Sequence, residues 1–437
     1  MRIFTPEDRH FPIGLTIMNK PLKYTLIILG CLAAMFIWFL LWLQCNPIHI
    51  GGANGHVKPA YCSIGEKWEE KQRKKETLKT VEEIKKNLEF TCVHEKRPPL
   101  SEETQQLYNY ALHRDLNHMW PGQRGDGFWD ELLPYYRIAA ANGDYKANVR
   151  LQFLLSDGWT RVPDIEAEAE TQKLYKMLHK QLPATAYYLL KGYIEDGYGV
   201  SAPPDSELAF LRKAADMGSR EAQYALAEKI AWLDDEPTRE FRLDLMRKIH
   251  QCASEQGQGA SSLELGSHLQ NRDRFDEAVK AYHQGVKNGN HLSAHILSYA
   301  FKAGKERGSN DFLDVEADEE RARRYDIINT YLSDYGFMSP TVPDLDDIVP
   351  LPPAPLPAWD GKIAFQRWVE GEEPQKPSDE LMKKLADKVG LDMKTGLPLP
   401  EQSQTEGTKA YPTYPYQSSS RGPKTVSLWN KLKKLIS

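Results

Sequence analysis

Residues 184–226 read ATAYYLLKGYIEDGYGVSAPPDSELAFLRKAADMGSREAQYAL, and this stretch decides the fold of the chain. Large apolar residues such as Tyr187, Leu190 and Ile194 recur in it at helical spacing, which places them on one face of a helix. The second half holds the small-residue series Ala214, Ala215, Gly218 and Ala222. Glycine ends a helix at little conformational cost because it tolerates positive φ. Alanines have small side chains and so let two antiparallel helices approach closely. The stretch therefore predicts paired helices joined by short turns.

The same series of small residues recurs elsewhere in the chain. Its other copies are Ala139, Ala140, Gly143 and Ala147; Ala253, Ser254, Gly257 and Ser261; and Gly285, Val286, Gly289 and Ser293. The four glycines are 75, 39 and 32 residues apart. The first gap fits two units of about 37 residues, with a degraded unit near Leu182 and Pro183. A single unit cannot bury its apolar face, so neighbouring units must stack, and residues 101–338 are predicted to form an all-α solenoid.

Residues 184–226 also resemble a Sel1-like repeat, a relative of the tetratricopeptide repeat. The matching positions are Gly192–Tyr193, Gly197, Gly199, Val200, Asp205, Phe210 and Lys213–Ala222. The resemblance implies a right-handed α-solenoid of helix pairs that presents a surface to other proteins. The copy that begins at Gln251 keeps Leu265–Gly266 but lacks the Gly-x-Gly-Val loop, so we expect about four to six repeats.

An apolar segment near the N-terminus predicts one transmembrane helix over residues 22–43. Its 19 residues from Thr25 to Leu43 span roughly 28 Å as a helix, close to the thickness of a bilayer core. Basic residues gather before it, at Arg2, Arg9, Lys20 and Lys23. By the positive-inside rule the N-terminus lies in the cytoplasm and the bulk of the chain in the periplasm, anchored to a bacterial inner membrane. A cleaved signal peptide and a lipobox ending at Cys31 fit less well, because the apolar stretch is long and continues past Cys31.

The predicted organisation has seven parts. They are a cytoplasmic N-terminus (1–21), the transmembrane helix (22–43), a linker (44–66), a charged helix with Cys62 and Cys92 (67–100), the repeat domain (101–338), a Pro-rich extended segment (339–370) and a C-terminal helix with a disordered tail (371–437). A disulfide between Cys62 and Cys92 and two unpaired thiols are equally good interpretations. Cys252, at a small-residue position of a helix, is predicted to be a packed core thiol.

No catalytic pattern stands out in the sequence. There is no GxSxG, HExxH, CxxC or phosphate-binding glycine loop. His113–Arg114–Asp115 imitates the kinase catalytic triplet by chance, and His291 with His295 is interpreted as a surface pair. A formal net charge of −5 without a basic stripe argues against nucleic-acid binding. We therefore expect neither an enzyme nor a cofactor, metal or small-molecule site.

An acidic cluster between prolines, Asp344, Asp346 and Asp347, has two interpretations. It is either a patch that faces a protein partner or makes a weak cation contact, with Trp359 as a further candidate partner-binding residue, or, as we favour, a set of capping and solubilising groups in a linker. Trp359 is predicted to pack the Pro-rich segment onto the repeats.

Two further elements carry a second resemblance: FTCVHE at residues 90–95 and VPDLDDIVPLPPAPLPAWDG at residues 342–361. With the anchor and the repeats, they are similar to the Sel1-like-repeat proteins of the DUF6396 group of Gram-negative bacteria, over roughly residues 60–370. The resemblance implies a periplasmic immunity protein that neutralises a phospholipase effector of type VI secretion. The alternative is an envelope scaffold that regulates or assembles a membrane complex.

Overall fold

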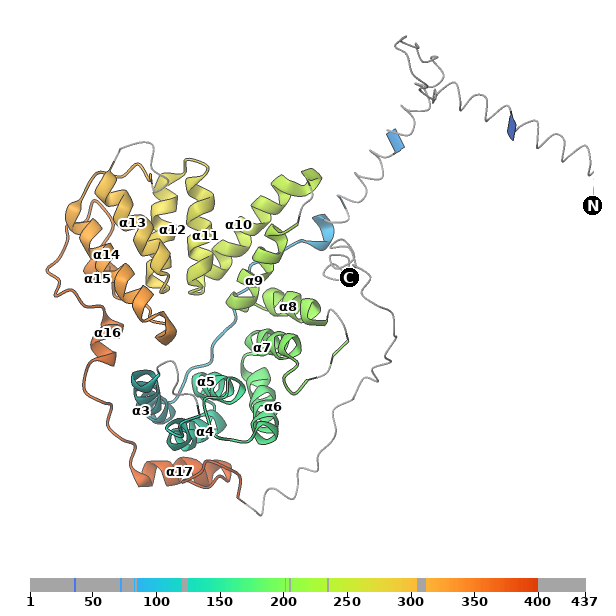
Figure 1. Ribbon diagram of the computed structural model, residues 1–437, viewed down its shortest axis with the longest axis vertical. Coiled ribbons are helices and arrows are strands. Elements are labelled where there is room, and N and C mark those ends of the chain that lie inside the picture. Colours follow the sequence, from blue (N-terminus) through green and yellow to red (C-terminus); the bar gives the residue numbers. More distant parts are fainter. Residues whose placement is uncertain are drawn as a thin grey trace, which may run out of the picture. The chain divides into compact units, whose positions relative to one another are not determined.

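The computed structural model describes most of the chain beyond the N-terminal region. The described residues are 35–36, 71–72, 82, 85–119, 125–200, 202–203, 206–233, 236–304 and 312–399. The chain divides into two compact units, Met1–Glu83 and Ile84–Ser437, and the second is described here (Figure 1). The predicted transmembrane segment lies outside the described residues except for Met35 and Phe36. None of the helices in the described part has both the length and the apolar character needed to cross a membrane.

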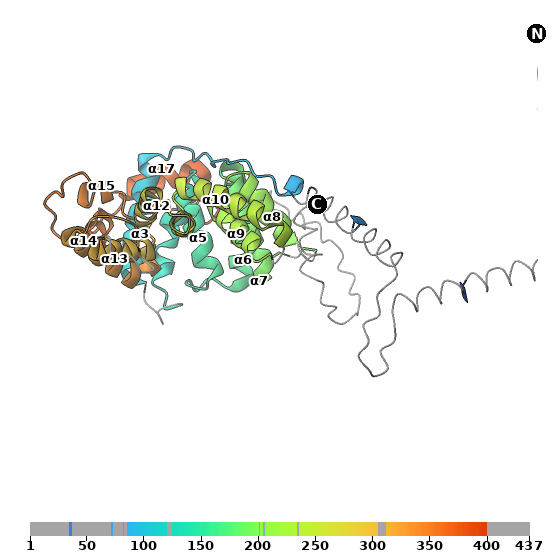
Figure 2. The ribbon, with the colours of Figure 1, turned by 90° about the horizontal axis from the view of Figure 1, so that it is seen from above.

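The second unit is helical. Its main helices are α3 (Glu102–His118), α4 (Leu133–Ala141), α5 (Tyr145–Ser156), α6 (Asp164–Gln181), α7 (Pro183–Asp196), α8 (Ser206–Asp216), α9 (Arg220–Ala231), α10 (Arg239–Glu255), α11 (Gly259–Gln270), α12 (Phe275–Lys287), α13 (His291–Ala303) and α14 (Glu319–Asp334). Shorter helices follow or intervene: η1 (Trp129–Glu131), η2 (Glu236–Thr238), η3 (Gly336–Met338), α15 (Leu345–Ile348), α16 (Ala364–Val369) and α17 (Asp379–Val389). Each helix from α3 to α14 packs on the next, as Figures 1 and 2 show. The prediction of an all-α solenoid is confirmed for the described residues.

The repeated glycines lie at the turns inside successive helix pairs. Gly143, Gly218, Gly257 and Gly289 follow α4, α8, α10 and α12, with φ of 98°, 102°, 95° and 84°. The next residue caps the following helix through its side chain; these residues are Asp144, Ser219, Gln258 and Asn290. Each cap accepts a hydrogen bond from a backbone N–H that the first turn of a helix leaves unpaired. The glycine and its capping neighbour thus reverse the chain within two residues.

The pair α6 and α7 is built differently, because Leu182 and Pro183 replace the glycine turn. Leu182 offers no side-chain cap to α7. The carboxylate of Glu95, far away in sequence, accepts hydrogen bonds from the backbone N–H of Ala184 at 2.7 Å and of Thr185 at 3.1 Å. A negative charge at a helix N-terminus is also favoured by the helix dipole. The degraded unit therefore obtains its cap from the N-terminal segment.

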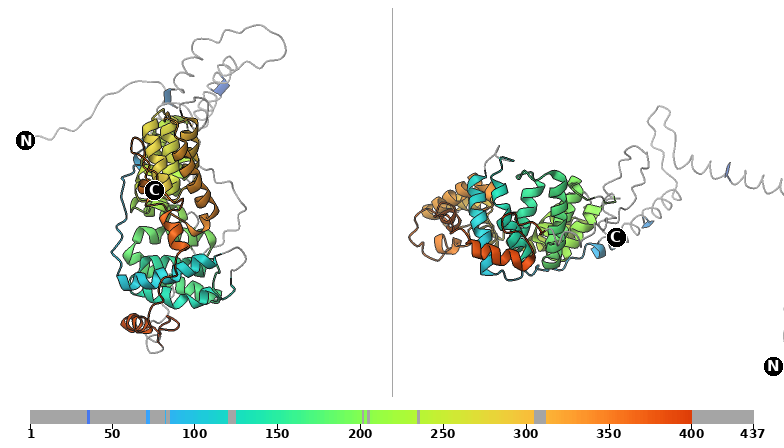
Figure 3. Two further views of the ribbon diagram at one scale, coloured as in Figure 1. Left: turned by 90° about the vertical axis from the view of Figure 1, so that its left-hand side faces the viewer. Right: turned by 90° about the horizontal axis from the view of Figure 1, so that it is seen from below.

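That N-terminal segment, residues 89–100, is extended and runs along one edge of the solenoid (Figures 2 and 3). A Cβ on Gly218 would lie 2.6 Å from the backbone nitrogen of Glu95, so only glycine permits this approach. Gln223 donates to the carbonyl of Val93 at 2.9 Å. Within the region 67–100, the charged helix is predicted to end at Leu88, and the described residues agree: residues 85–87 are helical and the chain from residue 89 follows the repeats.

A disulfide joins this segment to α10. Cys92 and Cys252 are bonded, with their Cα atoms 5.6 Å apart and a sequence separation of 160. The suggested pairing of Cys92 with Cys62 is therefore wrong, and so is the interpretation of Cys252 as a free core thiol. Cys62 lies outside the described residues. The correct pairing depends on how the extended segment crosses α10, which no local pattern reveals.

The C-terminal segment returns to the first helices of the solenoid (Figure 1). Val369 of α16 and Met338 pack against Leu116 of α3. Met382 and Leu385 of α17 enter the core formed by α3, α4 and α5. The segment predicted as extended, 339–370, contains the short helices α15 and α16, and the helix predicted within residues 371–437 is α17. The two ends of the repeat array are thus tied together.

A buried ion pair joins the first helices. Asp115 is completely buried, and its carboxylate accepts hydrogen bonds from Arg150 at 2.7 Å, Trp129 at 2.8 Å and Tyr136 at 2.7 Å. Burial and the nearby Asp115 charge raise the pKa of Tyr136 well above its usual value, so its hydroxyl stays a donor. Asp115, part of the triplet that imitates a kinase motif, is thus a structural residue.

Candidate partner-binding site

The Pro-rich segment is held against α12 and α14 by its apolar residues and by arginines. Val342, Leu345, Ile348 and Val349 are buried in the core of the last repeats. Two buried arginines of α14 donate to its carbonyl groups: Arg321 to Pro350 at 3.2 Å, and Arg324 to Ile348 and Pro357 at 2.5 and 2.7 Å. Prolines lack the N–H that would pair such a segment with another strand, so side-chain donors satisfy its carbonyls. The arginines were not predicted from the sequence.

This arrangement forms an open pocket on the segment. The residues that line it are Asp344, Asp347, Ile348, Ala358, Trp359, Asp360 and Arg367. Three of the four residues singled out in the sequence therefore lie together, namely Asp344, Asp347 and Trp359. The indole of Trp359 is fixed because its Nε1 donates to the carbonyl of Lys362 at 2.7 Å. The guanidinium of Arg324 lies 5.7 Å from the centre of the Trp359 ring, within reach of a cation–π contact.

The pocket is acidic. Three carboxylates and one guanidinium line it, which leaves a formal charge of −2. Arg367 bonds to Asp360 at 2.7 Å and holds the pKa of that carboxyl below its usual value. One oxygen of Asp344 accepts from the backbone of Ala364 at 2.9 Å, while the other is buried without a hydrogen-bond partner among the described residues. Asp347 is exposed. The pocket therefore retains acceptor capacity and negative charge for an incoming cation.

Asp346 lies outside this pocket, although it was grouped with its neighbours in the sequence. Its carboxylate bonds to His283 at 2.7 Å and to Lys287 at 2.5 Å, which ties α15 to α12. Burial acts to raise the pKa of Asp346, but the bonds from Lys287 and His283 outweigh it and lower that pKa. Asp346 binds α12 while the next residue, Asp347, lines the pocket, so Asp346 holds the segment in place.

The region that holds the pocket matches a known protein family. Residues 293–399 match the model of DUF6396, a domain of unknown function. The resemblance stated above is confirmed for these residues, and the matched region includes most of α13, all of α14–α17, and every residue of the pocket. The matched region does not form a separate unit. Its first helix, α13, packs against α12, and its last helices, α16 and α17, pack against α3 and α4.

Solved structures similar to this chain include two from Pseudomonas aeruginosa. The protein designated PA5086 is 26% identical with a TM-score of 0.44, and the match covers 61% of this chain and 96% of that one. The immunity protein Pa5087 is 24% identical with a TM-score of 0.43 and the same coverages, 61% and 96%. A Sel1 repeat protein from Oxalobacter formigenes is 19% identical with a TM-score of 0.34, over 53% and 83%. No curated protein matches the chain.

Proposed function

We propose that this chain binds another protein and that the pocket of the region matched to DUF6396 takes a basic side chain of that partner. The observation that carries the proposal is the pocket itself, where Asp344, Asp347 and Asp360 gather around a fixed indole with a single opposing arginine. A lysine or arginine side chain offers an apolar stem to the indole and a positive head to the carboxylates. Charge complementarity of this kind supplies specificity and speeds association. We propose no catalytic role for the chain.

We further propose that the partner is a lipase-type effector of type VI secretion, and that the chain is its immunity protein, anchored in the inner membrane by residues 22–43 with the repeats in the periplasm. The support is the resemblance of residues 90–95 and 342–361 to the DUF6396 group, together with the apolar segment that follows the basic N-terminus. A toxin that attacks phospholipids from the periplasm must be neutralised there, so an anchored binder meets it at its target.

The immunity role predicts a lipase gene beside the gene for this chain, and co-expression of that lipase, directed to the periplasm, tests the role. Cells that produce the lipase are expected to die without the chain and to grow with it. Survival that is no better with the chain than without it contradicts the immunity role. A pull-down from detergent-solubilised envelope then identifies the partner, and recovery of a membrane complex would support the scaffold instead.

Pocket variants test the binding site separately. Asp347→Lys and Trp359→Ala are expected to weaken binding of the recovered partner by about 10- to 100-fold, which corresponds to roughly 1.4–2.7 kcal/mol. The control is Asp326→Lys, an exposed aspartate of α14 outside the pocket, which makes the same charge change. Titration calorimetry or surface plasmon resonance measures the dissociation constants. Equal affinity for Asp347→Lys and Asp326→Lys would show that the pocket does not take part.

A further inference from the structure

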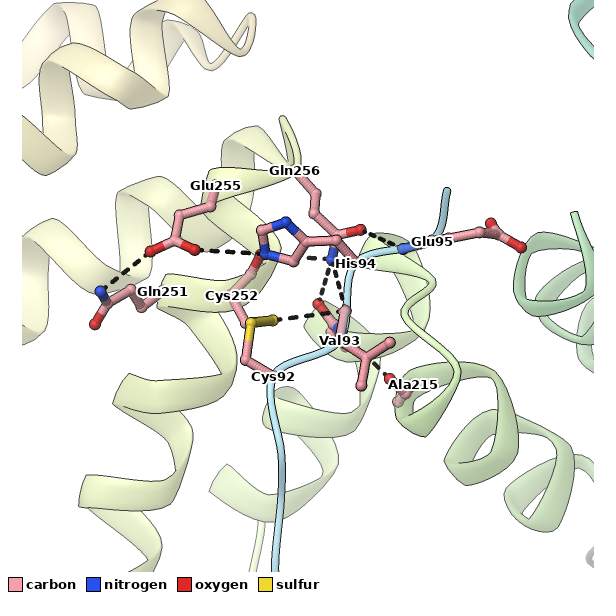
Figure 4. Close-up of a disulfide and its surroundings, with 10 residues drawn as sticks. Cys92, Val93, His94, Glu95, Ala215, Gln251, Cys252, Glu255 and Gln256 are labelled. Carbon is pink, nitrogen blue, oxygen red and sulfur yellow. Dashed lines mark hydrogen bonds and ion pairs between the residues drawn. A yellow bond between two sulfur atoms is a disulfide. The ribbon is translucent and has the colours of Figure 1, made fainter. Parts of the chain in front are cut away.

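Four side chains with metal-ligand chemistry meet where the N-terminal segment crosses α10 (Figure 4). The sulfurs of Cys92 and Cys252 and a ring nitrogen of His94 all lie within 4.8 Å of one another. Glu255 extends the group, because its carboxylate lies 3.4 Å from Nε2 of His94. Elsewhere in the described residues, the Asp115 and Asp346 carboxylates already bind arginine, lysine and histidine side chains, whereas this cluster combines thiol, imidazole and carboxylate groups.

We propose that the reduced form of this cluster binds one Zn²⁺ ion. Zinc takes four ligands in a tetrahedron and prefers thiolate and imidazole, with carboxylate as a common fourth. Cys92 and His94 are two residues apart on an extended segment, while Cys252 and Glu255 are three apart on a helix and so share a face. Two ligands thus come from each of two elements that the fold already holds together.

Access and local support favour a site at this position. Cys252 is buried, while the side chains of His94 and Glu255 are about half exposed, so an ion reaches the thiolates from the solvent side. The surrounding backbone is held independently of the sulfurs: Gln256 accepts from the N–H of Glu95 at 3.2 Å, and Gln223 binds the carbonyl of Val93. Reduction of the disulfide therefore leaves the ligands near one another.

Reduction of the disulfide and binding of zinc are two successive steps. A dithiol reductant supplies two electrons and two protons, the Cys92–Cys252 bond breaks to two thiols, and the reductant becomes a disulfide. Zn²⁺ then replaces the two thiol protons, which pass to the solvent. The disulfide and the metal exclude each other, and either one links the N-terminal segment to α10.

Zinc titration of the full chain in detergent tests the proposal. The protein is reduced with a dithiol, freed from it under anaerobic conditions, and titrated in competition with a chromophoric chelator. The reduced protein is expected to bind one equivalent of zinc, and the oxidised protein none at this site. Cobalt bound in place of zinc is expected to show thiolate-to-metal absorption, which identifies the sulfur ligands.

Variants separate this site from other thiols and histidines. Cys252→Ser is expected to abolish stoichiometric binding, and His94→Ala and Glu255→Gln to weaken it at least about tenfold. The last two side chains are half exposed, so their loss leaves the fold intact, as circular dichroism would verify. His295→Ala and Cys62→Ser serve as matched controls that keep full binding. The proposal is overturned if the reduced protein binds no zinc, or if binding survives both Cys252→Ser and His94→Ala.

Discussion

Asp115→Ala is expected to lower the free energy of unfolding by about 3–5 kcal/mol, because it leaves the largely buried Arg150 without its counterion. The aspartate is fully buried and is the shared acceptor for Arg150, Trp129 and Tyr136, so its removal also leaves two neutral donors unpaired. These groups come from α3, η1, α4 and α5. The loss should therefore appear in equilibrium denaturant unfolding followed by circular dichroism.

Two further variants show whether the loss of stability in Asp115→Ala comes from the buried charge or from the change in side-chain shape. Glu131→Ala removes an exposed carboxylate that lies 3.9 Å from Arg114, and it is expected to change the stability by less than about 0.5 kcal/mol. The double variant Asp115→Leu with Arg150→Met should recover a large part of the lost stability, since no charge then remains buried. A loss below about 1 kcal/mol for Asp115→Ala would contradict the structural role assigned to this network.

Cys252→Ser is expected to cost roughly 3–5 kcal/mol under oxidising conditions, because the disulfide closes a loop across 160 residues. Within that loop lie α3 to α9 and most of α10, so the cross-link restricts much of the unfolded chain. Cys92→Ser should have the same effect, and the double variant should cost no more than either single one, since both remove one bond. Thermal and denaturant unfolding measure these differences.

The control for this pairing is Cys62→Ser, which is expected to leave stability unchanged. Mass spectrometry of peptides from the non-reduced protein should recover Cys92 linked to Cys252. A destabilised Cys62→Ser beside an unaffected Cys252→Ser would instead restore the pairing of Cys62 with Cys92.

The candidate site was only partly predictable. Asp344, Asp347 and Trp359 stand out because they lie within a Pro-rich stretch of the sequence. Arg367 and Asp360 join them because α16 turns back across the segment. Asp346 differs from Asp344 and Asp347 because its carboxylate binds His283 and Lys287 of α12 instead of lining the pocket. Which of several adjacent carboxylates faces the pocket depends on packing that the linear pattern does not contain.

The sequence alone determined the helices, their turns and their stacking. A glycine with positive φ, a capping residue and an apolar face act over a few residues, so positions such as Gly218 and Ser219 carry the information locally. Only the tertiary structure decided that Cys92 bonds to Cys252, that Glu95 caps α7, and that α16 and α17 return to α3 and α4. These contacts join residues far apart in the chain, and their partners are chosen by where the solenoid brings its edges, which no short stretch encodes.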